Sequence, residues 1–305
     1  MSTMLIREAV DVIPRTVRIL VLCAVLGAVA GQAFGQDAVR LEYKFRPGEL
    51  LRYKVVMNMK MDMQMSAPDA SSVQMPPMRM QAVGIMRQRT KRVLPNGDAE
   101  VASAVESMKM TMGDKTEAMP AKKMPVTTMV ISKNGVLKSV QGLDKVYNQF
   151  GGMQFFSPES FGQFAGFPEG ELKAGDTWTQ DIPFPMGGGS LRVSGKFLSA
   201  NTKLGSYTVA TLEQNAGGDI SFDIPVPAPN SEASSTAANM GAKGAFLGDA
   251  KVYFSVEKGL MVRTDGKANI QMKMDFSGGP DGQQGAMNIG IDVNFQMFLL
   301  PGQAK

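Results

Sequence analysis

The fold is decided between Leu51 and Met65, where the sequence reads LRYKVVMNMKMDMQM. Every second residue there is apolar, and most residues in between are charged or carry an amide. The alternating apolar positions are Leu51, Tyr53, Val55, Met57, Met59, Met61, Met63 and Met65. This alternation predicts a β-strand with one dry and one wet face, as in an antiparallel sheet covered on one side. At about 3.3 Å per residue the segment would reach roughly 50 Å, so we expect a curved sheet.

Tight turns join further strands after this segment. Asn96 and Gly97 separate two long alternating segments, and Asn134 and Gly135 separate two shorter ones. An Asn-Gly pair supplies the positive φ angles that a two-residue hairpin turn requires. More alternating segments follow residue 169, interrupted by residues 225–244, where Pro, Ala, Ser and Asn predict a loop. The sequence therefore predicts a mainly β protein with long antiparallel strands.

Residues 142–166 have a different pattern and divide the strands into two sets. Their phenylalanines are not spaced as in a strand, and Ser157-Pro158-Glu159 resembles a helix start, with a capping hydroxyl and a proline in the first turn. We expect short helices here, in the middle of the chain. The sequence then predicts an N-terminal antiparallel β unit over 37–168 and a C-terminal one over 169–305, arranged as one extended curved sheet or as two half-barrel units joined near Phe167.

The chain begins with the features of an export signal. Arg7, Arg15 and Arg18 precede an apolar run of residues 19–30, and small residues follow up to Gly35. This order is typical of a secretory signal peptide, which we assign to residues 1–36. The apolar run is shorter than the ~20 residues of a membrane-spanning helix, so we favour cleavage over an uncleaved anchor. We expect an exported bacterial protein, periplasmic or extracellular, with membrane association that is at most peripheral.

The composition excludes several classes of function. The chain has no histidine, and its one cysteine, Cys23, lies in the predicted leader. A Ser-His-Asp relay, a thiolate nucleophile and a His- or Cys-based zinc site are therefore excluded. Carboxylates, lysines and hydroxyls remain, as for a paired-carboxylate glycosidase, but without a recognisable motif, so we expect no enzyme and no cofactor. Basic residues alternate with acidic and apolar ones and form no patch, which argues against a nucleic-acid partner.

Methionine is the unusual component, with 25 residues in the chain. The alternating rows are explained by core packing, as in a structural or interaction protein of the envelope, by an adaptable surface for an apolar ligand, or by Cu(I) binding through thioethers. We favour a surface that binds an apolar small molecule, a lipid or an acylated envelope partner. The candidate ligand-binding residues are Met57, Met59, Met61, Met63, Met80, Met108 and Met110. For the copper alternative, the candidate ligands are Met59, Met61 and Met110.

Two phrases resemble a family of uncharacterised secreted bacterial proteins. Pro168 is followed by Gly175-Asp176-Thr177-Trp178, similar to the proline and Gly-Asp-x-Trp phrase in the middle of that family. The early Phe45-Arg46-Pro47-Gly48-Glu49 resembles the start of its mature chains. The resemblance implies a secreted β-rich protein and carries no activity. More remotely, the pattern of long strands around short helices is similar to the half-barrels of periplasmic lipoprotein carriers, which hold acyl chains on a concave face.

Overall fold

The computed structural model describes residues 38–66, 72–119, 126–142, 166–183, 188–226, 238–277 and 284–301. These residues form β-strands and the turns between them, so the prediction of a mainly β, antiparallel fold is confirmed. Within these ranges no helix is long and apolar enough to cross a membrane. The predicted signal peptide at 1–36 and the stretch 143–165, where short helices are expected, lie outside the described residues.

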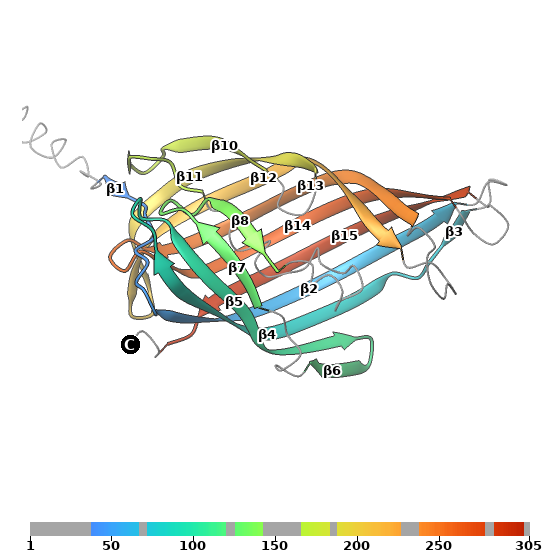
Figure 1. Cartoon of the computed structure of the whole chain (residues 1–305), viewed down its shortest axis with the longest axis horizontal. Coiled ribbons are helices and arrows are strands. Elements are labelled where there is room, and N and C mark those ends of the chain that lie inside the picture. Colours follow the sequence, from blue (N-terminus) through green and yellow to red (C-terminus); the bar gives the residue numbers. More distant parts are fainter. Residues whose placement is uncertain are drawn as a thin grey trace, which may run out of the picture. The chain divides into compact units, whose positions relative to one another are not determined.

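Thirteen strands form one sheet, shown in Figure 1. Its order is β10-β11-β12-β13-β14-β15-β2-β4-β5-β7-β8, with β3 also paired to β2 and β6 also paired to β5. The strands before residue 142 are β2 (Leu50–Ser66), β3 (Ser72–Gln74), β4 (Met78–Val93), β5 (Ala99–Met112), β6 (Lys115–Met119), β7 (Val126–Ile131) and β8 (Leu137–Gln141). Those after residue 166 are β10 (Thr177–Pro183), β11 (Gly188–Leu204), β12 (Tyr207–Val226), β13 (Ala238–Ser255), β14 (Leu260–Ser277) and β15 (Gln284–Leu299). Two short strands, β1 (Val39–Arg40) and β9 (Glu171–Leu172), pair separately.

The first and last long strands of the chain lie side by side in this sheet. β15 pairs with β2 from Ala286 opposite Ser66 to Leu299 opposite Tyr53, without a shift in register. The strands on both sides of residue 168 therefore belong to one continuous, open sheet with β10 and β8 at its edges. Of the two predicted arrangements, one extended curved sheet or two half-barrel units, this is the extended sheet. The division into units at 37–168 and 169–305 stays a prediction.

Residues 38–46 connect distant strands at one end of the sheet. The Tyr43 amide donates to the carbonyl of Lys133 in the β7–β8 turn at 2.6 Å. The next amide, that of Lys44, donates to the carbonyl of Gly259 in the β13–β14 turn at 2.9 Å. Because adjacent residues bond to turns that connect strands far apart in the sheet order, the sheet must curve around this segment with its apolar face inward.

Aromatic rings fill the curved sheet at this end. The ring of Phe167 lies 4.9 Å from that of Phe254 and 5.8 Å from that of Tyr43, between ring centroids. Phe167, Phe254 and Leu41 are almost fully buried, at 1%, 0% and 1% exposure. We call the part of the apolar face covered by residues 38–46 and 166–172 the aromatic end.

The Gly-Asp-x-Trp phrase attaches the edge strand β10 to the aromatic end. Gly175 adopts a φ of +96°, which favours glycine, and the Asp176 carboxylate accepts a hydrogen bond from the Lys173 amide at 2.8 Å. Trp178 then enters β10 and donates from its indole nitrogen to the Gly166 carbonyl at 3.1 Å. Its ring lies over Gly195, where a Cβ atom would clash. The phrase therefore has a structural role in this chain.

Several strand boundaries differ from the predictions. β13 begins at Ala238, so the predicted loop over 225–244 is partly strand, and β3 and β6 were not predicted. β12 continues without a break through Gly217 and Gly218. Gly218 lies so close to the backbone of Ser190 that a Cβ atom would not fit. A glycine inside this strand thus permits close approach of a neighbouring strand, as glycines in sheets often do.

Candidate functional site

The predicted methionine rows lie on one face of the sheet. Strand register places Met59 opposite Met80, and Met80 opposite Met112 on the following strand. The same register pairs Met57 with Ala82 and Ala82 with Met110, while Met108 lies opposite Gly84. Partners in an antiparallel ladder point to the same side, so all seven candidate residues line the apolar face. The alternation in the sequence predicts which side of each strand is apolar. The pairing of the strands joins these apolar sides into one face.

These methionines become more exposed with distance from the aromatic end. Met57 and Met59 belong to a buried cluster at 3% and 5% exposure, and Met61, Met63 and Met80 are only partly buried against that cluster. Met108 and Met110 are also partly exposed. Further along, Met65 and Met112 are exposed at 41% and 43%. The buried members therefore form a floor, and the others form a surface beside it.

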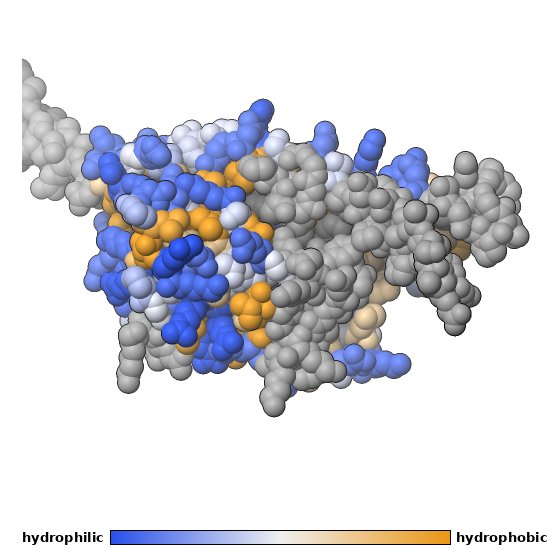
Figure 2. All heavy atoms as spheres, viewed as in Figure 1, coloured by the Kyte–Doolittle hydropathy of each residue, from blue (hydrophilic) through white to orange (hydrophobic). Residues whose placement is uncertain are grey.

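Most exposed large apolar side chains of the described residues gather in this region. Five of seven lie on β2 to β5 or in their connections, namely Met65, Val73, Met75, Met78 and Met112. We call this part of the apolar face the methionine end. On β14, by contrast, Met272 and Met274 stay buried. The other two exposed side chains are Leu247 and Val126, which is the first residue of β7. Figure 2 shows an apolar band among hydrophilic residues over the β7–β8 hairpin.

The register regroups the three predicted copper ligands. Met59 and Met61 lie on β2, but Met110 is on β5, directly opposite Ala82. The methionines that stand in one cross-strand row with Met59 are Met80 and Met112. Among the described residues, no group of three or more Asp, Glu, Cys or His side chains is placed to hold a metal ion.

A small cavity lies beside Gln214 on the apolar face. Its volume is about 40 Å³, and Phe246, Ala250 and Phe295 contribute to its wall. Gln214 is buried at 7% exposure, and its Nε2 has no hydrogen-bond partner among the described residues. Register places Gln214 opposite Ala250, in a row that continues through Gly266 and Phe295 to Met57. An unpaired buried amide carries an energetic cost, so such groups are rare in protein cores.

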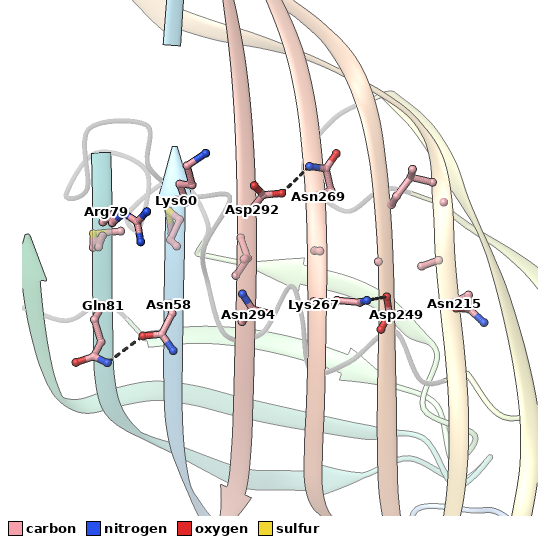
Figure 3. Close-up of a pocket in the computed structure, with 18 of the residues that line it drawn as sticks. Asn58, Lys60, Arg79, Gln81, Asn215, Asp249, Lys267, Asn269, Asp292 and Asn294 are labelled. Atoms are coloured by element: carbon pink, nitrogen blue, oxygen red, sulfur yellow. Dashed lines mark hydrogen bonds and ion pairs between the residues drawn. The ribbon is translucent and has the colours of Figure 1, made fainter. Parts of the chain in front are cut away.

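The opposite, polar face of the sheet holds a much larger hollow of about 1370 Å³, which sequence reasoning missed. Figure 3 shows its polar side chains on β4, β2, β15, β14, β13 and β12. Carboxamides line it on five of these strands: Asn58, Gln81, Asn215, Asn269 and Asn294. We call this hollow the polar groove. In the sequence, the groove is visible only as isolated Asn and Gln residues at the polar positions of separate alternating strands.

Two rows of side chains cross the polar groove. In the first, register connects Gln81, Asn58, Asn294, Lys267, Asp249 and Asn215 through consecutive strands. Gln81 donates to Asn58 at 2.9 Å, and Lys267 lies 3.5 Å from the Asp249 carboxylate. The second row contains Arg79, Lys60, Asp292 and Asn269, and Asn269 donates to Asp292 at 2.8 Å. These pairs, dashed in Figure 3, leave Asn215 and Asn294 without side-chain partners among the described residues.

Most perturbed ionisable groups lie outside both regions. The exception is Arg192 in the polar groove, whose pKa is raised by its hydrogen bond to Asp181. Asp98, in the β4–β5 turn, is buried, and burial raises the pKa of its carboxyl group. Hydrogen bonds from Lys138 at 2.6 Å and Asn96 at 2.8 Å outweigh burial and hold the pKa of Asp98 below its usual range. Burial raises the pKa of Tyr43 and Tyr53, and it also raises that of Glu49. Asp98, Tyr43 and Tyr53 are held in packed, bonded positions, which suits a structural role.

Comparison with other proteins identifies no family. No family model matches the chain, and no characterised protein matches its sequence. Among solved structures, a lipovitellin structure described for its lipid–protein interactions is similar, with 11% identity and a TM-score of 0.42 over 85% of this chain. The chain spans about a quarter of lipovitellin, 26% of its length. OpdQ of Pseudomonas aeruginosa has 6% identity and a TM-score of 0.20, covering 82% of this chain and 98% of that one. Likenesses at these TM-scores identify neither a ligand nor an activity for this chain.

Proposed function

We propose that the protein is a non-enzymatic binder of an apolar ligand, such as a lipid acyl chain or an acylated partner, at the methionine end. The observation that carries this proposal is the change in exposure along a single apolar face. Tyr53, Val55, Met57 and Met59 on β2 are buried, whereas Met65 on the same face of the same strand is exposed. Exposed clustered apolar side chains mark interaction sites, because soluble proteins rarely leave them uncovered.

Methionine suits such a surface for physical reasons. Its side chain is unbranched and polarizable, so it adapts to apolar partners of different shape, whereas the aromatic end is filled by rings in fixed contacts. In the proposed site Met57 and Met59 form the floor, and Met61, Met63, Met80, Met108 and Met110 contact the ligand. The predicted leader and the absence of histidine and mature cysteine support an exported protein of the bacterial periplasm or surface that uses no catalytic group.

Neighbouring residues on opposite faces of β4 provide the test. Met80 and Gln81 are consecutive residues of β4, so the side chain of Met80 lies on the methionine face and that of Gln81 on the polar face. A fluorescent fatty acid titrated into the protein is expected to bind the wild type and the Met80→Leu variant within about twofold of each other, because the volumes are similar. Met80→Asp should weaken binding at least tenfold, because an ionised carboxylate is costly beside an acyl chain.

Gln81→Asp is the matched control and should leave the fatty-acid affinity unchanged. Circular dichroism and thermal unfolding establish that each variant is folded. The proposal fails if the wild type binds no fatty acid, or if the two aspartate variants weaken binding equally.

Cu(I) binding is a second candidate, favoured by the row of Met59, Met80 and Met112 on three adjacent strands. Cross-strand partners have Cβ atoms about 5 Å apart, within reach of convergent thioethers. Titration with Cu(I) against a competing chelator would detect it. Replacement of these three residues by leucine should then abolish copper binding, while leucine at Met272 and Met274 should not. Fatty-acid binding should survive the first set of changes.

A further inference from the structure

The polar groove contains residues that a β-sheet does not favour. Asparagine is depleted in strands, yet Asn58, Asn269, Asn294 and Asn215 occupy the interiors of β2, β14, β15 and β12. They lie on adjacent or nearby strands and line the same hollow. Residues that contradict local preference without a structural gain are expected at functional sites. Asn215 and Asn294 have no such gain, since their side chains have no partner among the described residues.

The charges of the groove nearly cancel. Lys60, Arg79, Arg192 and Lys267 line it together with Asp114, Asp249 and Asp292. Lys267 is paired with Asp249, and Arg192 is paired with Asp181 at 3.0 Å. A ligand with many charges of one sign would gain little from this arrangement, because the four positive side chains are offset by three negative ones. The groove therefore favours an uncharged ligand that forms many hydrogen bonds.

An apolar side chain lies at the end of the second polar row, next to Asn269. Leu247 on β13 is 63% exposed and lies against the backbone of Gly217, where a Cβ atom would be 3.1 Å from Leu247 Cδ2. Leu247 occupies the same row as Asn269. A ligand bound across the groove would meet carboxamides on both sides of a small apolar surface.

We infer that the polar groove is a binding site for an uncharged oligosaccharide. Each carboxamide offers donors and an acceptor, which matches hydroxyl groups that also donate and accept, and Leu247 can contact the C–H groups of a sugar ring. Extended peptides bind sheets by pairing with an exposed strand edge. The strands under the groove, by contrast, are paired on both sides, so only side chains are available to the ligand. The polar side chains of this site lie on the face opposite the methionine end, although Met59 and Met80 also belong to the lining of the groove. The inference does not depend on the function proposed for the methionine end.

Valine substitutions separate binding from stability. Asn215→Val and Asn294→Val remove the unpaired carboxamides and improve strand preference, so both variants should unfold at the same or a higher temperature. Their affinity for a neutral oligosaccharide should fall at least tenfold. Asn288→Val is the control, because Asn288 is also on β15, faces the same side and lies outside the groove lining. It should bind as the wild type does.

The experiment is native mass spectrometry and calorimetry on the wild-type protein with hexamers of glucose, mannose and N-acetylglucosamine. Binding of at least one hexamer, lost in the two groove variants and kept in Asn288→Val, is the expected result. The inference is overturned if no hexamer binds, or if the groove variants bind as well as the wild type. It is equally overturned if the groove residues are needed only for an extended peptide or for a polyanion such as heparin.

Discussion

The two ends of the apolar face use different side chains for different purposes. At the aromatic end, Tyr43, Phe167 and Phe254 contact one another and are covered by residues 38–46 and 166–172. At the methionine end, the same strand β2 continues with Met61, Met63 and Met65, which become progressively exposed. An alternating apolar strand therefore predicts a face but not what covers it. Rings in fixed contacts specify the core at the aromatic end, where Met86, Met261 and Met297 are also buried. The exposed thioethers of the methionine end leave a surface that can adapt.

The largest expected effect is at the aromatic end. Phe167→Ala removes a ring with 1% exposure that contacts two others, and it should lower the free energy of unfolding by about 3–5 kcal/mol. Urea unfolding followed by the fluorescence of Trp178, the one tryptophan of the chain, measures this loss. Met63→Ala is the matched change at the methionine end and should cost much less. Equal losses would contradict the distinction between the two ends.

The next effect concerns the turns near the aromatic end. Because the pKa of Asp98 is lowered in the folded protein, its ion pair with Lys138 stabilises the fold above the unfolded value of 3.8. That contribution is lost as the pH falls through the lower folded value. Lys138→Met should cost about 1–3 kcal/mol at pH 7 and less at low pH, since protonation of Asp98 removes the charge with which Lys138 pairs.

Urea unfolding of the Lys138→Met variant at pH 7, 4 and 2 tests this dependence. Lys196→Met removes a charge from an exposed strand position and serves as the control, with little change at any pH. A loss in Lys138→Met that is the same at pH 7 and pH 2 would show that the ion pair is not its cause.

A smaller effect of opposite sign is expected at Gln214, between the two ends. Gln214→Met replaces a buried amide with an unpaired nitrogen by a thioether of similar length, so it should raise the free energy of unfolding by about 1 kcal/mol. Gln271→Met, on the solvent side of β14, should change it by less than about 0.5 kcal/mol. Destabilisation by Gln214→Met would mean that the amide has a partner in the folded protein.

The smallest effect is expected at the exposed limit of the methionine end. Met65→Ala should change the free energy of unfolding by less than about 0.5 kcal/mol, because the side chain is 41% exposed. The same denaturation assay measures it. A loss above 2 kcal/mol would place Met65 in a packed core and remove the contrast with Phe167.

Local sequence signals predicted the strands but not their partners. The alternation from Leu51 to Met65 predicted β2, and both Asn-Gly pairs form turns in which Gly97 and Gly135 have φ of +85°. The pairing of β2 with β15 joins residues more than two hundred positions apart. It depends on the match of two apolar faces, which no local pattern encodes. The bridge from Tyr43 to Lys133 was unpredictable for the same reason.

The candidate sites were predictable to different degrees. Each methionine of the proposed site could be assigned to a face, since side chains alternate strictly along a strand. Which of them are exposed could not, because Met59 and Met65 look identical in the sequence and differ only in what surrounds them. The polar groove was missed, because Asn58, Asn294 and Asn215 form a row only after the five strands β2, β15, β14, β13 and β12 are placed in register.

The most direct test of the methionine end is oxidation of each methionine by hydrogen peroxide, followed by peptide mass spectrometry with and without a fatty acid such as oleate. Exposed thioethers oxidise first, so Met65 and Met112 should react at least tenfold faster than Met86 and Met129, which are 2% and 1% exposed. Oleate should then slow oxidation of Met80 and Met112 and leave Met86 unchanged. Uniform rates along the face, or rates that oleate does not alter, would contradict the account.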